Sequence, residues 1–201
     1  MKSSSLKIGL MSLTFYLLLS LLFLFFFTSL YDTKPHVQTF TDRHDVVIGS
    51  LNPDFKGFQI WTHFSDISPE FVAKTIQKED SFFYWHQGVN PWALLKALGS
   101  HLVNTGVRRG GSTITQQLAK NLIQEKLCQE NECRPLPRNI PQKIKETVLA
   151  LGLEMKHSKK WILERYLNTI YYGNHCYGVG AASQYYFPKH LKNSRLPKLT
   201  A

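Results

Sequence analysis

The feature that most constrains the fold is an unbroken apolar segment near the N-terminus. Residues 8–30 carry no charged side chain and are rich in Leu and Phe. At ~1.5 Å per residue, a helix of this length reaches about 35 Å, slightly more than the roughly 30 Å core of a bilayer. A signal-peptide core is shorter, at about 7–15 residues. We therefore predict an uncleaved transmembrane anchor, with cleavage near Thr28-Ser29 as the alternative.

The charges that flank this segment predict its orientation. Lys2 and Lys7 precede it, whereas Asp32 and Lys34 balance each other after it. The positive-inside rule then places the N-terminus in the cytoplasm and the rest of the chain outside. We expect a cytoplasmic tail (1–7), a single-pass anchor (8–30), a linker with at most one strand (31–60) and one folded domain (61–201).

The formal net charge of +10 narrows the class of partner. A basic external domain suits anionic lipid headgroups and phosphate-bearing substrates. Nucleic acid is the other usual partner of such charge, but the anchor and the lack of a nucleic-acid motif argue against it. Cys128 and Cys133 are close enough in sequence for a small-loop disulfide, with unpaired thiols as an equal alternative, and Cys176 is left over. Their spacing does not suit a zinc site, so no metal site is predicted.

Residues 110–121 begin with a turn and continue as a helix. Gly110 and Gly111 allow a sharp turn close to a ligand. Ser112 or Thr113 can cap the helix, and Gln116 stands where a capping box needs it. The buried stripe is expected to contain Ile114, Leu118 and Leu122, and the polar face Thr113, Gln117, Lys120, Asn121 and Gln124. Two interpretations stay open here, an ordinary capped helix and an anion site at a helix N-terminus.

A second candidate region lies at the C-terminal end of the helix that is predicted to start at Ser68-Pro69. Val72 and Ile76 form an apolar stripe whose next position is Glu79. A carboxyl group against apolar walls has a raised pKa, which suits a general acid or base near neutral pH. The alternative is that Glu79 and Asp80 simply end the helix in water. The aromatic-rich turn from Phe82 to Gly88 argues against that alternative, and Asn90 is expected to cap a further helix.

Two later helices are predicted from their caps and apolar spacing. Pro141 opens a helix whose core stripe is expected to be Ile144, Val148, Leu151 and Met155, with Lys143 and Glu146 off that stripe. Ser158 caps another, with Ile162, Leu163, Tyr166 and Ile170 pointing inward and Glu164 and Asn168 in structural roles. A final helix over 179–187 is stopped by Pro188.

Five stretches in this order resemble the motifs of the peptidoglycan glycosyltransferase family, which comprises monofunctional transglycosylases and the glycosyltransferase domains of class A penicillin-binding proteins. The first contains Glu79, Asp80, Phe83, His86 and Gly88, and the second is 110–121. The third contains Lys143 and Glu146, and the last two span 160–173 and 177–189. The resemblance implies a mostly α, lysozyme-like, two-lobed helical glycosyltransferase domain with a groove between its lobes, behind the N-terminal transmembrane helix.

The resemblance also implies a function at the outer face of the bacterial cytoplasmic (inner) membrane. Lipid II and the growing glycan chain would be the substrates, polymerised into β-1,4 glycan strands of peptidoglycan with loss of undecaprenyl pyrophosphate. Membrane lipid and other cell-wall synthesis proteins are the further expected partners, and nucleic acid is not. No cofactor is obligatory, although a divalent cation (Mg²⁺ or Mn²⁺) could screen the pyrophosphate.

The same resemblance assigns residue roles. Glu79 would be the general base, and Glu146 with Lys143 would hold and activate the leaving group. Thr113, Gln117 and Lys120 would position the sugar pyrophosphate, and Gly110, Ser112 and Asn121 belong to the same substrate-binding stretch. Asp80, Phe83 and His86 would shape the first motif.

Three departures from the family pattern leave alternative functions open. Gln142 stands where the third motif usually begins with Arg, and Asn90 stands where Asp is usual. The third departure is that the domain is expected to be truncated at its C-terminal end. Separately, residues 125–141 form a longer connection than the family's and are expected to be a surface insertion. The alternative function is therefore a catalytically impaired relative that binds lipid II or acts as a scaffold. A two-carboxylate hydrolase is a more distant alternative.

Overall fold

The computed structural model describes residues 2–29, 31, 37–44, 47–52, 57–91, 111–130 and 132–187. The expected helix after Asn90, Gly110 and the end of the chain after 187 lie outside this part. Most of the described residues are helical, as predicted. The helices are α1 (Lys2–Ser29), α2 (Pro69–Glu79), α4 (Ile114–Gln129), α5 (Ile140–Lys156), α6 (Lys159–Thr169) and α7 (Gly178–Tyr186), and 3₁₀ turns cover Phe64–Asp66 and Phe83–Trp85.

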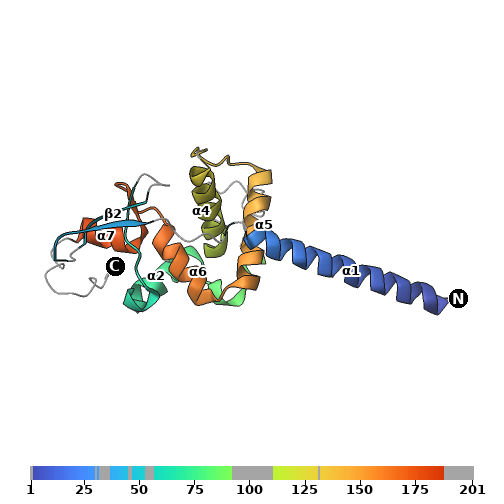
Figure 1. Ribbon diagram of the computed structural model, residues 1–201. Helices are drawn as coiled ribbons and strands as arrows, with labels where there is room; N and C mark the ends of the chain where they lie inside the picture. Colours follow the sequence, from blue (N-terminus) through green and yellow to red (C-terminus); the bar gives the residue numbers. More distant parts are fainter. Residues whose placement is uncertain are drawn as a thin grey trace, which may run out of the picture.

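The N-terminal helix α1 extends away from the rest of the protein and meets it only at its C-terminal end (Figure 1). There it packs on α5, where a Cβ atom at Gly152 would overlap the side chain of Thr28. Lys156 Nζ donates to Ser29 Oγ at 3.4 Å. A helix over the apolar segment is thus confirmed. Within the part of the chain that is described, however, no helix combines the length and apolarity needed to cross a membrane, so a transmembrane span is not confirmed.

A small sheet lies beside the helices and was largely missed by the sequence prediction. Its strands, in spatial order, are β1 (Gln38–Thr41), β2 (Val47–Asn52), β3 (Gly57–Gln59) and β4 (Cys176–Tyr177). The first two pairings are antiparallel, whereas β3 and β4 are parallel. The segment predicted as a linker with at most one strand therefore supplies three strands. Its last strand, β3, pairs with β4, so this segment is attached to the C-terminal part of the domain.

The core lies between α4, α5 and α6. The predicted stripe of α4 is confirmed, since Ile114, Leu118 and Leu122 are at most 1% exposed. On α6, Ile162, Leu163 and Tyr166 are fully buried as expected, and Ile170 packs at the margin. Asn168 and Thr169, at the end of α6, are also buried. Asn168 hydrogen-bonds to the backbone N–H and C=O of Thr62, which confirms its structural role. Glu164 likewise accepts from the backbone N–H of Phe64 at 3.1 Å.

The predicted core face of α5 is wrong. Ile144, Leu151 and Met155 are exposed, whereas Leu149 and Leu153 are fully buried. The helix is apolar on two faces, and periodicity alone cannot tell which face meets α4. Because the face with Leu149 and Leu153 is the one turned inward, Glu146 lies one turn before them on the buried side, where the sequence analysis had not placed it.

Candidate active site

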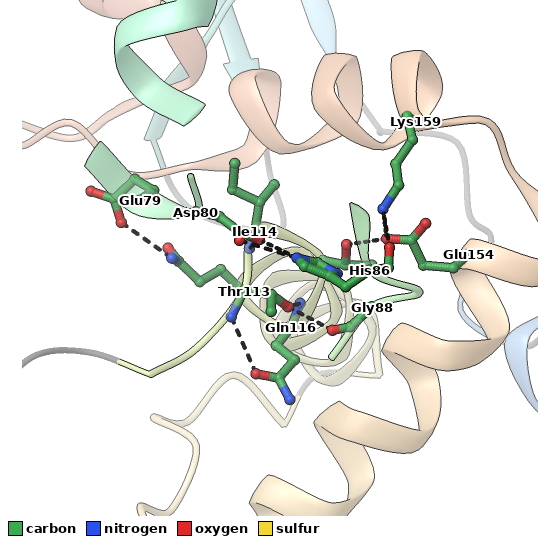
Figure 2. A network of polar contacts seen from close by, with 11 residues as sticks. Glu79, Asp80, His86, Gly88, Thr113, Ile114, Gln116, Glu154 and Lys159 are labelled. Atoms are coloured by element: carbon green, nitrogen blue, oxygen red, sulfur yellow. Dashed lines mark hydrogen bonds and ion pairs between the residues drawn. The ribbon is translucent and has the colours of Figure 1, made fainter. Parts of the chain in front are cut away.

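The adjacent carboxylates at the end of α2 point in different directions, as Figure 2 shows. Asp80 is buried, and its carboxylate accepts from the backbone N–H of Ile114 at 3.0 Å. The same carboxylate contacts His86 Nε2 at 2.9 Å. Asp80 therefore ties the first motif to the N-terminus of α4. A carboxylate at a helix N-terminus is stabilised by the free N–H groups and the helix dipole.

The predicted capping box at the start of α4 is confirmed, with Thr113 as the cap. Thr113 Oγ1 accepts from Gln116 N at 3.1 Å, and Gln116 Oε1 accepts from Thr113 N at 3.2 Å. The Thr113 hydroxyl also donates to the carbonyl of Gly88 at 2.6 Å. Gly88 has φ of 83°, and a Cβ there would lie 2.8 Å from the carbonyl of Ala150. The turn between the motifs therefore requires glycine.

A lysine that the sequence analysis did not select completes this arrangement. Lys159 Nζ donates to the carbonyl of His86 and to Glu154 Oε1, both at 2.7 Å, and lies 4.3 Å from the ring centre of Phe83. Glu154 Oε1 also accepts from Thr115 Oγ1 at 2.6 Å. We call the set Asp80, His86, Thr113, Thr115, Glu154 and Lys159 the buried network. Thr115, Glu154 and Lys159 lie on three different helices. Helical spacing in the sequence therefore could not have predicted these contacts.

Glu79 is exposed, whereas the sequence predicted a carboxylate set against apolar walls. Instead, Gln117 Nε2 donates to Glu79 Oε2 at 3.2 Å, and Tyr166 Oη donates to Gln117 Oε1 at 3.1 Å. Burial raises the pKa of Tyr166 above its ordinary value, and the Glu79 carboxylate raises it further. Burial and Glu79 raise the pKa of Tyr172 in the same way. Tyr166 thus stays protonated and orients Gln117 toward Glu79.

Next to Gln117 lies a cavity of about 550 Å³, which we call the cationic pocket. Its walls come from the start of α4, the start of α5 and the segment between these helices. The lining residues are Ser112, Gln116, Gln117, Lys120, Leu136, Pro137, Arg138, Asn139, Ile140, Gln142, Lys143 and Glu146. Three of them are cationic and one is a carboxylate, so the pocket favours an anionic ligand.

Hydrogen bonds inside the pocket engage some of the lining side chains and not others. Lys143 Nζ donates to Ser112 Oγ at 2.7 Å and to Glu146 Oε2 at 3.3 Å. Gln142 Nε2 donates to Glu146 Oε1 at 3.4 Å, so both oxygens of this largely buried carboxylate are engaged. Lys120 and Arg138 are exposed, and neither forms an ion pair within the described ranges. Lys143 also lines the pocket and is exposed, but it is already paired with Glu146.

Most of the predicted site residues fall into two groups, while Glu79 lies outside both and contacts Gln117. The cationic pocket unites Ser112, Gln117, Lys120, Lys143 and Glu146, while Asp80, Phe83, His86 and Thr113 lie in or against the buried network. Asn121 is half-buried on α4 and does not line the pocket. Gly110 lies outside the described residues. Across the described ranges, no group of three or more His, Cys, Asp or Glu side chains is arranged to hold a metal ion.

Comparison with known proteins gives a family match over most of the chain. The model of the transglycosylase family matches residues 44–199. Among curated proteins, penicillin-binding protein 4 of Bacillus subtilis is 36% identical over 152 residues, which is 76% of this chain and 23% of that protein. Penicillin-binding protein 1A of Escherichia coli is 46% identical over 123 residues, which is 61% of this chain and 13% of that protein.

Penicillin-binding protein 1A of Aquifex aeolicus is 43% identical over 127 residues, or 63% of this chain and 16% of that protein. The chain thus spans less than a quarter of the length of each of these relatives. The matched region contains the end of α2, the cationic pocket and the buried network. On this evidence the chain belongs to the transglycosylase family, the enzyme family of peptidoglycan glycosyltransferase domains.

Proposed function

We propose that this chain polymerises lipid II into β-1,4 glycan strands and displaces undecaprenyl pyrophosphate. The observation that carries the proposal is the position of Gln117. This residue lines the cationic pocket and donates its amide N–H to Glu79. An exposed carboxylate and an anion-binding cavity are therefore neighbours, separated by one side chain. A sugar transfer from a lipid pyrophosphate needs this pair of features.

In the proposed reaction, Glu79 takes the proton from the 4-hydroxyl of the acceptor sugar. That oxygen attacks the anomeric carbon of the donor, which is the growing chain, and the bond to the pyrophosphate oxygen breaks with inversion. The exposure of Glu79 leaves its carboxylate within reach of an acceptor. The hydrogen bonds from Tyr166 to Gln117 and from Gln117 to Glu79 fix the direction of the carboxylate.

The leaving pyrophosphate is proposed to bind in the cationic pocket. Lys120 reaches the pocket from α4 and Lys143 from α5. Ser112 and Glu146 orient the Lys143 ammonium before a ligand arrives, which lowers the cost of ordering it on binding. The chain is proposed to need no obligatory cofactor. A Mg²⁺ or Mn²⁺ ion would be carried mainly by the pyrophosphate oxygens, because Lys143 and Gln142 already engage Glu146.

The substrate is borne on a membrane lipid, so the domain is proposed to work at the outer surface of the cytoplasmic membrane. The uncharged segment 8–30, which exposes most of its described side chains, is proposed to hold it there, with Lys2 and Lys7 on the cytoplasmic side. Other cell-wall synthesis proteins are the proposed protein partners.

Turnover of labelled lipid II by the purified full chain tests the proposal. We expect glycan chains from the wild type and a loss of at least about a hundredfold in rate for Glu79→Gln. Glu70→Gln is the matched control, because Glu70 is an exposed carboxylate on the same helix that pairs only along the surface with Lys74. It should retain the wild-type rate. A wild type that binds lipid II without making chains would favour the scaffold function instead.

A further inference from the structure

The outer face of α5 carries an apolar stripe that the core of the domain does not use. Ile144, Leu151 and Met155 are 58%, 37% and 54% exposed, whereas Leu149 and Leu153 are fully buried. At about 100° per residue, the three exposed side chains fall within one narrow arc, opposite the two buried ones. A helix on the surface of a soluble domain usually presents polar side chains on the face opposite its core. The stripe therefore favours an apolar surrounding outside the domain.

The N-terminal helix α1 leaves the domain beside this stripe. Its last turns pack on the flank of α5, where a Cβ atom at Gly152 would overlap Thr28 and lie 3.3 Å from Leu24 Cδ1. From there α1 extends away from α4 and α6, and α5 runs across its direction (Figure 1). The stripe faces away from the same core, so it lies on the side of the domain from which α1 departs. A helix that lies in the surface of a bilayer, beside a segment that enters it, has this arrangement.

Three lysines lie where α1 joins the domain. We call them the lysine collar: Lys126 on α4, and Lys145 and Lys156 on α5. Lys126 Nζ and Lys145 Nζ lie 5.0 and 5.4 Å from the ring centre of Tyr31, just beyond α1. Lys156 Nζ donates to Ser29 Oγ at 3.4 Å. Lys126 also faces Glu130 at 4.0 Å, a surface pair that contributes little. Lysines at the end of a membrane-bound segment attract the phosphates of anionic lipid headgroups.

We propose that the outer face of α5 and the lysine collar form a docking surface for a bilayer with anionic headgroups. The apolar stripe enters the boundary between headgroups and acyl chains, and the collar binds headgroup phosphates around the end of α1. The net charge of +10 complements such a surface. The inference rests on the proposed attachment of segment 8–30 to the membrane. It goes beyond that attachment, because it gives the folded domain its own lipid contact and hence one orientation on the membrane.

Thiol labelling of the full chain in vesicles of phosphatidylcholine and phosphatidylglycerol tests the stripe. Cys176 is buried and Cys128 is bonded to Cys133, so a water-soluble maleimide labels an introduced cysteine. With each rate normalised to that of the same variant in urea, Met155→Cys should react about tenfold more slowly than Tyr185→Cys. Tyr185 is the matched control, because it is 55% exposed, against 54% for Met155, and α7 lies at the far end of the domain from α1 (Figure 1).

The same label tests the headgroup charge and the collar. In vesicles of phosphatidylcholine alone, the protection of Met155→Cys should fall about threefold or more. Gln at the three collar positions should lower it to that level in the anionic vesicles, whereas Arg at these positions keeps the charges and should keep the protection. Gln at Lys74, Lys78 and Lys160, which are exposed lysines outside the collar, is the matched control and should change nothing.

Equal normalised rates for Met155→Cys and Tyr185→Cys in the anionic vesicles would overturn the inference. Protection that is the same in phosphatidylcholine alone, or that survives Gln at the collar, would also overturn it. So would protection in detergent that grows with protein concentration, because it would mark a contact between copies of the chain. Labelling does not depend on turnover, so a chain that makes no glycan from lipid II counts against the proposed function alone. A chain that does not float with vesicles contradicts both the anchor and the docking surface.

Discussion

The buried network and the cationic pocket lie on two sides of the first turn of α4 and are built from neighbouring residues in the chain. Asp80 joins the network through His86 and Ile114, while Glu79 beside it is exposed and points toward Gln117. Thr113 donates to Gly88, while Ser112 beside it accepts from Lys143 in the pocket. Consecutive residues of each motif therefore serve different purposes. One of each pair holds the buried network together, and the other lies in or beside the cationic pocket.

The two regions also differ in where their charges find partners. In the network, Glu154 and Lys159 satisfy each other, with Thr115 and the carbonyl of His86 as further partners. In the pocket, Lys120 and Arg138 have no ionic partner among the residues described. Changes in the network should therefore reduce stability, whereas changes in the pocket should reduce binding and turnover while the fold persists.

Lys120→Ala is expected to have the largest effect on turnover, a loss of roughly 10² to 10³ in the lipid II polymerisation rate, because it removes a cation from the developing pyrophosphate charge. Its free energy of unfolding should stay within about 0.5 kcal/mol of the wild type. Glu164→Ala is the comparison, since the Glu164 carboxylate accepts only from the Phe64 backbone N–H among the described contacts. Equal losses of activity in the two variants would mean that the polar face of α4 is structural.

Asp80→Asn should have the opposite effect, with a loss of about 3 kcal/mol in the free energy of unfolding measured by urea titration. The amide cannot replace the buried carboxylate that accepts from Ile114 N and contacts His86 Nε2. Glu79→Gln, one residue earlier, should change this free energy by no more than about 0.5 kcal/mol. Similar stabilities for the two variants would remove the distinction between network and pocket.

Replacing both Cys128 and Cys133, which form a disulfide at the end of α4, with Ser should produce a smaller effect. For so short a loop, chain entropy predicts a loss of about 2 kcal/mol in unfolding free energy. Pyrophosphate binding should weaken only a few-fold, because Asn139, which caps α5, still holds the pocket-lining end of the segment between α4 and α5. Reductant should reproduce the stability loss in the wild type and leave the double Ser variant unchanged. Sensitivity of that variant to reductant would indicate an intermolecular disulfide through Cys176, the one cysteine that remains.

Local sequence signals predicted several of these features well. The Thr113/Gln116 capping box, the Ser158 cap and the buried stripe of α4 depend on residues within one or two turns, and all are present. The disulfide was one of two open alternatives because spacing shows only that two thiols can meet. The motif resemblance selected Ser112, Gln117, Lys120, Lys143 and Glu146, which line the pocket. Thr113 and Asn121, which it also assigned to the substrate, do not line it.

Features that depend on distant segments were not predictable in this way. Strand β3 pairs with β4 through Phe58 and Cys176, which are far apart in the chain, so neither short strand has a local signal. The buried face of α5 depends on α4 and not on the apolar pattern of α5, which has two candidate faces. The exposure of Glu79 follows from the turn at Asp80, whose carboxylate enters the core. Lys159 was missed because its partners come from separate elements.

The central claim is that Glu79 performs chemistry beside a pocket that binds the substrate independently of it. Lipid II binding and chain formation, measured on the same preparation of Glu79→Gln, test this most directly. We predict a Kd within about threefold of the wild type, since the Glu79 carboxylate lies outside the cationic pocket. No glycan chains should form. Wild-type polymerisation by this variant, or loss of lipid II binding together with turnover, would contradict the account.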